Sequence, residues 1–195
     1  MIVLDNLLEW LTPHDCLGCG VEGLLLCDGC AAVLPSARTA KIRSATIYTG
    51  VAKDLVWRLK FDGAHSAAQI MARQMLPLLP KQGVLVPVPT TTLRRRQRGY
   101  DQTILLAQEL SRLSGLPVGR WLARSGQQHQ IGADRMQRRL QLLGVFRLTR
   151  RARPVGKHII LIDDVVTTGA TLEAAATVLA SGGAAGVTAI VFAQA

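Results

Sequence analysis

The segment HIILIDDVVTTGATL, residues 158–172, places strong limits on the fold of this chain. Four apolar residues lead into two adjacent acids, and a loop with two threonines and one glycine then precedes a helix-like stretch. A short apolar run of this kind is typical of a strand buried in a parallel sheet. Ligands of such sheets bind beyond the carboxyl ends of the strands, where Asp163 and Asp164 stand. We therefore expect a ligand site at this point.

Apolar strands alternate with helical patterns along most of the chain. The ranges that we expect to be strands are 44–51, 83–89, 145–148, 158–163 and 187–193. The ranges with helical apolar spacing are 3–11, 52–61, 65–79, 101–115 and 170–181. This alternation predicts an α/β fold with a parallel sheet. A Cys- and Gly-rich stretch over 16–30 predicts a small separate module, so we place the domains at 1–40 and 41–195.

The two acids and the loop after them predict a phosphate site. Consecutive strand residues point to opposite faces, so Asp163 and Asp164 are expected to have different roles. One would face the ligand crevice, and the other would steady the loop or reach a metal-bound ligand. Backbone N–H groups at the start of the following helix would surround an anion. Gly169 permits a positive φ, and three threonines add hydroxyl donors: Thr167, Thr168 and Thr171.

Two other interpretations of this segment are open. An apolar strand that ends in two acids also occurs beside nucleotide phosphate loops, where an Asp organises Mg²⁺. The partner motif of that arrangement, G-x-x-x-x-G-K-[ST], is absent, because VGKH at 155–158 does not satisfy it. The second interpretation is a helix cap and loop acid that bind no ligand.

All four cysteines lie in one pattern, C-x₂-C-x₇-C-x₂-C, formed by Cys16, Cys19, Cys27 and Cys30. Two such pairs can hold one Zn²⁺ tetrahedrally with four thiolates. Free thiols and an iron–sulfur cluster are the alternatives. Four thiolates leave no open coordination position, so a zinc ion here would be structural.

The charge of the chain favours phosphate-bearing partners. The formal net charge is +10, with 18 Arg against 5 Lys, and guanidinium groups bind phosphate with two parallel hydrogen bonds. Arg94 and Arg98 follow a predicted strand end and are the candidate ligands of a pyrophosphate. Aromatic residues make up 4% of the chain, which does not favour an aromatic platform for single strands. We expect the aromatic residues Trp57, Tyr100 and Trp121 to lie in the core.

Nothing in the sequence predicts secretion or a membrane span. The N-terminal stretch MIVLDNLLEW carries two acids and no Lys or Arg, which is wrong for a signal peptide. The last 22 residues are uncharged, but Ser181, Gly182 and Gly183 interrupt them. We therefore expect a cytoplasmic protein that does not span the membrane.

The segment from Asp163 to Thr171 resembles the thirteen-residue signature of the type I phosphoribosyltransferases. Members of that family bind 5-phosphoribosyl-1-pyrophosphate (PRPP) together with Mg²⁺. The resemblance implies that the two acids meet the ribose hydroxyls and that the loop wraps the 5-phosphate. The binding residues that it implies are Asp163, Asp164, Val165, Val166, Thr167, Thr168, Gly169, Ala170 and Thr171.

Several blocks in order resemble the ComF/ComFC (GntX-like) competence proteins. They are the Cys₄ pattern, RLKFDG (58–63), VPVP with RRRQRGYDQ (86–102), R…Q…R…GVF (124–146) and IDDVVTTGAT (162–171). Asp101 replaces the Asn that the family usually has after the aromatic residue. The resemblance implies a zinc finger joined to a phosphoribosyltransferase-type domain. It also implies handling of incoming single-stranded DNA at the inner face of the cytoplasmic membrane, with the DNA channel and its helicase as partners.

Three functions remain open at this stage. The first is a PRPP-binding competence factor that acts with single-stranded DNA. The second is a metabolic enzyme that transfers phosphoribosyl to a nitrogen base, and the third is an adaptor that senses PRPP without turnover. No residue is singled out as the general base, since His65, His129 and His158 are candidates by residue type alone.

Overall fold

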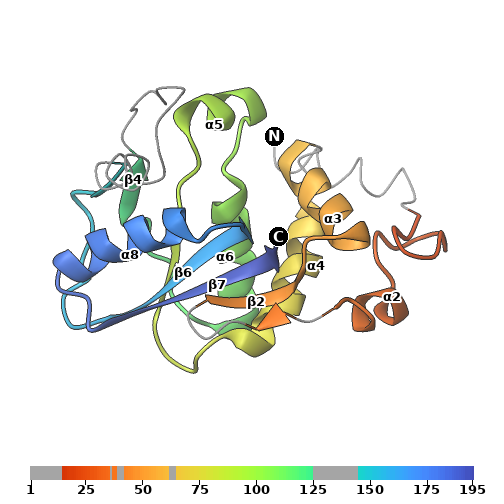
Figure 1. Ribbon diagram of the computed structural model, residues 1–195, viewed down its shortest axis with the longest axis horizontal. Coiled ribbons are helices and arrows are strands. Elements are labelled where there is room, and N and C mark those ends of the chain that lie inside the picture. Colours follow the sequence, from red (N-terminus) through yellow and green to blue (C-terminus); the bar gives the residue numbers. More distant parts are fainter. Residues whose placement is uncertain (1–14, 36, 39–41, 62–64, 125–144) are drawn as a thin grey trace.

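The computed structural model describes residues 15–35, 37–38, 42–61, 65–124 and 145–195. Within these ranges the main sheet has the strand order β1-β2-β7-β6-β3 (Figure 1). Its strands are β1 (Ala37–Arg38), β2 (Ile42–Ile47), β3 (Val84–Pro87), β6 (His158–Val166) and β7 (Gly186–Gln194). The pairs β2–β7, β7–β6 and β6–β3 are parallel, and β1 is antiparallel to β2. The predicted α/β fold with a parallel sheet is confirmed.

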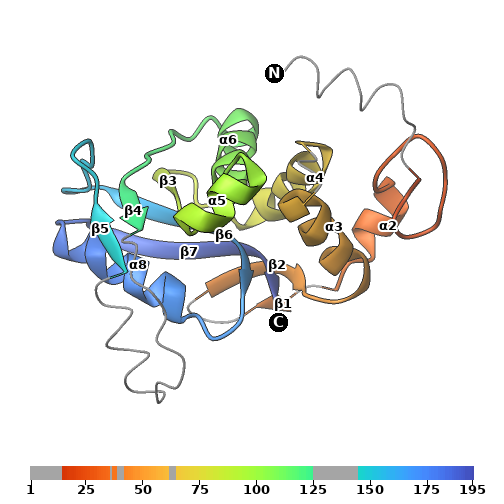
Figure 2. The same cartoon turned by 90° about the horizontal axis from the view of Figure 1, so that it is seen from above.

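Helices cover both faces of this sheet. The α-helices are α2 (Asp28–Ala32), α3 (Gly50–Phe61), α4 (His65–Met75), α5 (Thr92–Arg98), α6 (Gln102–Ser114) and α8 (Ala170–Ser181). A 3₁₀ turn, η1 (Leu76–Leu78), extends α4. Figures 1 and 2 show α3, α4 and α6 on one face, whereas α8 lies on the other. The second small sheet, β4 (Leu122–Arg124) with β5 (Phe146–Leu148), packs on the side of α8.

The interior strand β6 contributes side chains to two hydrophobic cores, one on each face of the sheet. Ile160 and Ile162 pack in the cluster with α3, α4 and α6, whereas Ile159 and Leu161 pack in the cluster with α8. All four side chains are 0% exposed. This alternation is what a strand with apolar residues on both faces requires, because successive side chains point to opposite sides. Burial on both faces fixes the register of β6 and therefore the position of the two acids near its end.

Two predicted strands differ from the structure, and one helix was not predicted. The strand expected over 44–51 ends at Ile47, because α3 already begins at Gly50. Strand β6 continues beyond 163 to Val166, where it still pairs with Gln194 of β7. The arginine-rich stretch forms the helix α5, which the sequence did not predict. Thr91 caps it by accepting from the Arg94 N–H, and Gly99 ends it with φ of 80°.

Three predicted helices agree with the structure. The helices over 52–61 and 101–115 are confirmed within two residues, and the one over 170–181 matches α8. The helix expected over 3–11 and the residue His129 lie outside the described residues. No helix in the described ranges is both long enough and apolar enough to cross a bilayer.

The prediction of a buried Trp57 was wrong. Trp121 is 9% exposed and packs with Phe146 in the core on the α8 side, as expected. Tyr100 is partly buried, and its hydroxyl donates to the Leu59 carbonyl. Trp57, by contrast, is 54% exposed, because α3 buries Leu55, Val56 and Leu59 and turns Trp57 toward solvent.

Candidate functional site

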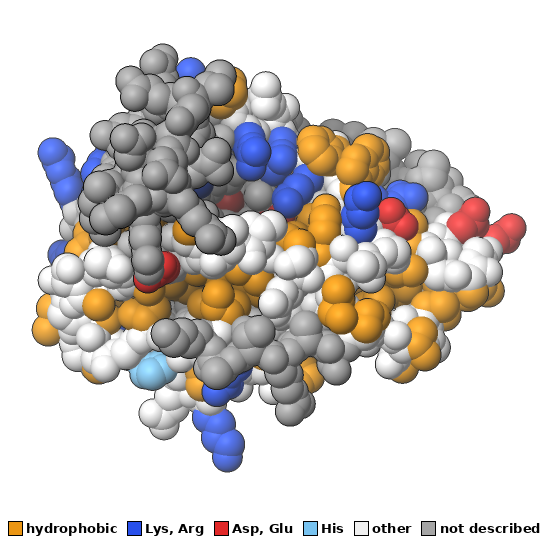
Figure 3. Space-filling model, in the orientation of Figure 1, with side chains coloured by type: hydrophobic (Ala, Val, Ile, Leu, Met, Phe, Trp, Pro, Cys, Tyr) orange, Lys and Arg blue, Asp and Glu red, His pale blue; other side chains and the backbone are white. Residues whose placement is uncertain are grey.

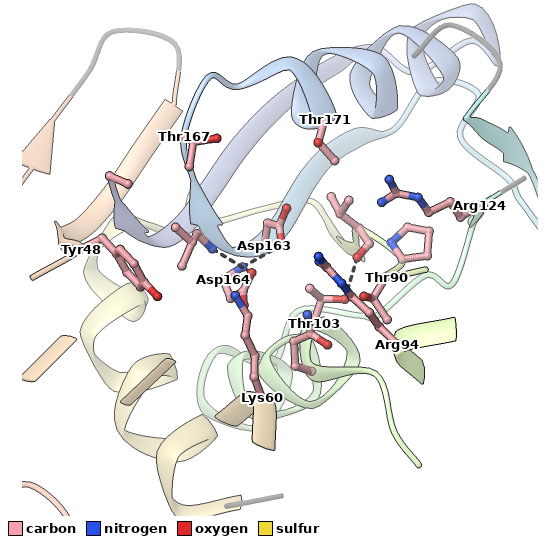
Figure 4. Close-up of a pocket in the computed structure, with 15 residues that line it drawn as sticks. Tyr48, Lys60, Thr90, Arg94, Thr103, Arg124, Asp163, Asp164, Thr167 and Thr171 are labelled. Atoms are coloured by element: carbon pink, nitrogen blue, oxygen red, sulfur yellow. Dashed lines mark hydrogen bonds and ion pairs between the residues drawn. The ribbon is translucent and has the colours of Figure 1, made fainter. Parts of the chain in front are cut away.

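A cavity of about 390 Å³ lies at the carboxyl ends of β3 and β6 (Figure 4). This is the place where parallel α/β sheets bind their ligands. Its lining combines two acids, three basic side chains and several hydroxyls: Asp163, Asp164, Lys60, Arg94, Arg124, Tyr48, Thr90, Thr103, Thr167 and Thr171. In Figure 3, acidic side chains are recessed below the surface near the middle of the view, and Lys and Arg side chains lie beside them. The cavity is therefore polar and carries both charges.

The two adjacent acids point in different directions from the end of β6. Figure 4 shows Asp163 on the side of Thr171 and Asp164 on the side of Lys60. The Asp164 N–H donates to Asp163 Oδ1 at 2.9 Å, and the Val165 N–H donates to Asp164 Oδ1 at 2.9 Å. Both acids line the cavity, and Asp164 is 4% exposed. The predicted division into two orientations agrees with this geometry.

Lys60 supplies a positive charge that the sequence interpretation did not assign to the site. Its Nζ lies 2.7 Å from Asp164 Oδ2. The contact lacks hydrogen-bond geometry, so Oδ2 has no hydrogen-bond donor among the described residues. An ion pair at this distance still balances the carboxylate charge, and we regard it as the dominant interaction of that oxygen. The one sequence signal for Lys60 was its place in the RLKFDG block.

Burial raises the pKa of Asp163 well above the ordinary range of an aspartate. The negative charge of neighbouring Asp164 raises it further, and the Lys60 charge opposes both effects. Asp163 thus retains a proton at a pH where a solvent-exposed aspartate is ionised. A cation or a hydroxyl-rich ligand that favours the ionised carboxylate would displace this proton.

The loop after β6 and the first turn of α8 border the cavity through Thr167 and Thr171. The first helical bond of α8 runs from the Glu173 N–H to the Gly169 carbonyl at 2.9 Å, so the amides of residues 170–172 have no acceptor within the helix. The Ala170 N–H has a weak contact of 3.4 Å with Thr168 Oγ1. Gly169 has φ of 78°, and an added Cβ would lie 3.1 Å from Ile42 Cδ1. Glycine is therefore required for this turn.

The structure separates the nine predicted PRPP-binding residues into three groups. Five line the cavity: Asp163, Asp164, Val165, Thr167 and Thr171. Three do not line it: Thr168 and Gly169 belong to the turn after β6, and Ala170 is the first residue of α8. Val166 is 6% exposed and packs in the core on the α8 side. Its side chain supports the loop from below.

Asp101 fixes the opposite wall of the cavity. Its Oδ2 accepts from the Thr90 N–H at 3.2 Å, and its Oδ1 accepts from the Thr103 N–H at 3.2 Å. Thr103 Oγ1 lies 2.8 Å from the same Oδ1 and 2.8 Å from the Val88 carbonyl. Both oxygens of this carboxylate accept hydrogen bonds, whereas an Asn side chain has one acceptor oxygen. The Asp at this position therefore holds the end of β3 against α6.

Two arginines face the cavity from different elements. Arg94 of α5 and Arg124 of β4 both line it, and they lie on the side opposite Tyr48 in Figure 4. Burial lowers the pKa of Arg124, with a smaller contribution from the Arg94 charge, but a guanidinium remains charged in proteins. Arg98 lies one turn beyond Arg94 and donates from Nη1 to Gln102 Oε1 at 3.0 Å. Of the two predicted anion ligands, the structure places Arg94 in the cavity.

The four cysteine sulfurs form a separate candidate metal centre. They all lie within 4.8 Å of one another, and the Cys19 and Cys27 sulfurs are 3.8 Å apart. Four thiolates around a tetrahedral zinc, at Zn–S of about 2.3 Å, would be separated by roughly 3.8 Å. A Cβ on Gly18 would lie 2.6 Å from Cys30 Sγ, so the turn leaves no room for a side chain. The four sulfurs could therefore hold one metal ion.

The thiols of this cluster differ in acidity. Hydrogen bonds from backbone N–H groups, that of Cys27 first, lower the pKa of Cys16 to about 6. The neighbouring Cys27 sulfur, followed by that of Cys19, raises the pKa of Cys30 to about 12. Sulfurs so close together resist simultaneous ionisation unless a cation neutralises them. This donor set fits a thiophilic divalent ion.

Residues 62–195 match the family described as the phosphoribosyl transferase domain. The chain therefore contains a phosphoribosyltransferase-type domain, with the two acids at the carboxyl end of strand β6. A solved structure with a similar fold is glutamine PRPP amidotransferase from Bacillus subtilis, with a TM-score of 0.48 and 20% identity, covering 65% of this chain and 26% of that chain.

Proteins with a described cellular role are also similar to this chain. It is 32% identical over 180 residues to the competence protein ComFC of Bacillus subtilis, covering 87% of this chain and 72% of that protein. It is 30% identical over 187 residues to the DNA utilization protein YhgH of Salmonella typhimurium, covering 87% and 79%. The chain belongs to the ComF family of competence and DNA utilization proteins, as its sequence blocks predicted.

Proposed function

We propose that this protein binds PRPP with Mg²⁺ in the cavity and assists the handling of single-stranded DNA in natural transformation. One observation carries the PRPP part of this proposal. The acidic pair of β6 and the helix start of α8 line one cavity together with Arg94 and Arg124. A ribose with phosphates at both ends needs acceptors for its hydroxyls between two anion sites. The two acids would accept from the hydroxyls, and the helix start and the two arginines would provide the two anion sites.

The residues suggest a role for each part of the ligand. The 5-phosphate would lie in the loop of residues 167–171, where amides and threonine hydroxyls can donate to it. Asp163 and Asp164 would accept from the ribose hydroxyls, and the pyrophosphate would lie toward Arg94 and Arg124. Mg²⁺ bound with PRPP would neutralise part of the pyrophosphate charge. Asp164 Oδ2, which lies 2.7 Å from Lys60 Nζ, has no hydrogen-bond donor among the described residues, so it could accept from a ribose hydroxyl.

Calorimetric titration of PRPP with Mg²⁺ tests the proposed site. We expect saturable binding to the wild type and no measurable binding to the Asp163→Ala/Asp164→Ala variant. The single variants Asp163→Asn and Asp164→Asn keep the side-chain shape and should weaken binding by about tenfold or more, because each removes a charge-assisted hydrogen bond. Asp54→Asn on the exposed surface of α3 makes the same charge change outside the cavity and serves as the control.

The outcome also separates the remaining functions. Wild-type protein that fails to bind PRPP would contradict the proposal. Release of pyrophosphate on addition of a nitrogen base would identify a phosphoribosyltransferase. Binding without release would favour a regulator or adaptor that responds to PRPP.

The affinity for PRPP with Mg²⁺ should depend on pH through Asp163. Its pKa is raised, so the folded protein keeps a proton that the ligand must displace, and affinity should increase as pH rises through this pKa. The same proton stabilises the folded state at low pH, and this contribution is lost as pH rises through the raised pKa. Titrations in two buffers of different ionisation enthalpy should show proton release in the wild type and less release in Asp163→Asn. Equal release from both would argue against this assignment.

We also propose that the cysteine cluster holds a structural Zn²⁺ and that the protein acts at the inner face of the cytoplasmic membrane. The zinc proposal is supported by the four-thiolate donor set, whose sulfurs all lie within 4.8 Å of one another. The DNA role is supported by the names of the relatives and by the net charge of +10. The DNA-uptake channel and its helicase are the partners that we propose.

A further inference from the structure

Two large aromatic side chains are exposed on helix α3. Trp57 is 54% exposed and Phe61 is 61% exposed. Their ring centroids are 5.5 Å apart, with an angle of 40° between the ring planes. They are four residues apart in a helix and therefore share one face. Aromatic rings normally bury most of their area, so an exposed pair in contact is a candidate binding surface.

The exposed pair is continuous with the cavity. The guanidinium of Arg98 lies 5.1 Å from the centre of the Phe61 ring. Arg94, one turn earlier on α5, lines the cavity, and so does Lys60, the residue before Phe61. We call Trp57, Phe61, Arg94 and Arg98 the aromatic strip. Figure 3 shows Lys and Arg side chains beside hydrophobic ones along the edge where α5 and α3 lie in Figure 1.

The chemistry of this strip favours one kind of occupant. Flat rings bind the faces of nucleobases, and arginines beside them bind the phosphates that link the bases. A guanidinium over a ring still presents N–H groups at its edge for a phosphate. An apolar partner would require a broader hydrophobic patch than two rings. The net charge of +10 favours a polyanionic ligand over a neutral or positively charged one.

We propose that the aromatic strip binds single-stranded DNA, with bases stacked on Trp57 and Phe61 and a phosphate held by Arg98, while Arg94 joins the strip to the cavity. This inference rests on the proposed DNA handling and assigns a place to it. It also changes the expectation from composition. Few aromatic residues are needed when two of them are exposed together beside arginines.

The test measures the affinity of the zinc-containing protein for a labelled oligothymidylate, by fluorescence anisotropy at fixed salt. We expect Trp57→Leu, which removes the ring but keeps an apolar side chain, to weaken binding about tenfold. Trp57→Phe keeps a ring and should remain close to the wild type. Val155→Ala is the control, because Val155 is 76% exposed and lies before the amino end of β6, whereas the cavity lies at the carboxyl end.

Two further readouts separate stacking from a general loss of structure. Stacking should quench the fluorescence of Trp57, so Trp57→Phe should lose that quenching while it keeps its affinity. Arg98→Gln removes a phosphate contact and should reduce the slope of log affinity against log salt by about 0.7. Trp57→Leu should leave this slope unchanged, since a ring releases no counterions. PRPP titration of every variant shows that the cavity is intact.

Unchanged DNA affinity in both Trp57→Leu and Phe61→Leu would overturn the inference while leaving the proposed function standing. Wild-type protein that binds PRPP but no oligothymidylate would overturn this inference and the DNA role together, and the PRPP site would stand. A change in self-association without a change in DNA binding would identify the strip as an interface between copies of this chain. That result would also overturn the inference.

Discussion

Removal of the Zn²⁺ that we propose for the cysteine cluster is expected to unfold the segment around it and to destabilise the main domain. Structural zinc supplies much of the folding free energy of small Cys₄ modules. Cys16, Leu25 and Leu26 pack in the same hydrophobic cluster as α3, α4 and α6, so their loss reaches the main core. We expect the Cys16→Ser/Cys30→Ser variant to lower the thermal midpoint by about 10 °C. Scanning calorimetry of this variant and of chelator-treated wild type measures the effect.

The cysteine count makes this experiment selective. The chain has 4 cysteines, all in the cluster, so a thiol reagent reports on the cluster alone. Elemental analysis should give one zinc per wild-type chain and none in the variant. Val33→Ala is the control, because Val33 lies just beyond α2 and is 78% exposed. A protein without zinc that keeps the wild-type midpoint would disprove a structural role for the metal.

Replacement of Lys60 by Met is expected to give the second large effect. Asp164 is buried, and removing the cation beside its carboxylate leaves that charge uncompensated. The Lys60 side chain is 23% exposed, so solvent moderates the loss, and we expect about 2 kcal/mol in the free energy of unfolding. PRPP affinity should also fall, since Lys60 lines the cavity. Urea unfolding at neutral pH measures the stability change.

A double-mutant cycle isolates the ion pair from other effects of the substitution. Asp164→Asn removes the charge that Lys60 balances, so Lys60→Met should cost much less stability in that background. Lys53→Met, on the exposed side of the same helix, controls for loss of a lysine from α3. Equal costs of Lys60→Met in the two backgrounds would show that the pair contributes nothing to stability.

The sheet and its acids could be predicted because their signals are local. The apolar run 159–162, followed by Asp163 and Asp164, indicates both a buried strand and its ligand-facing end. The cysteine spacing is equally local. For these parts, hydrophobic pattern and turn chemistry agree with the tertiary fold.

Three features were not predicted from the sequence, each for a different physical reason. Lys60 reaches Asp164 across more than a hundred positions, and no pattern around Lys60 reveals its partner. Trp57 was expected in the core because large aromatic residues are usually buried, but α3 presents other residues to the core. Helix α5 was missed because an arginine run has no apolar period. Its evidence was the Thr91 cap and the Gly99 end.

Helix α3 connects the two sites that the sequence treats as separate. At its first turn, Val51 lies against the cysteine module, since a Cβ on Gly18 would be 3.7 Å from Val51 Cγ2. At its last turn it carries Lys60, which faces the cavity. Its 12 residues span roughly 18 Å at about 1.5 Å per residue. The segment with the four cysteines therefore packs against the first turn of the helix that carries Lys60. Deletion of residues 1–40 would remove this packing and should disturb the position of Lys60 in the cavity.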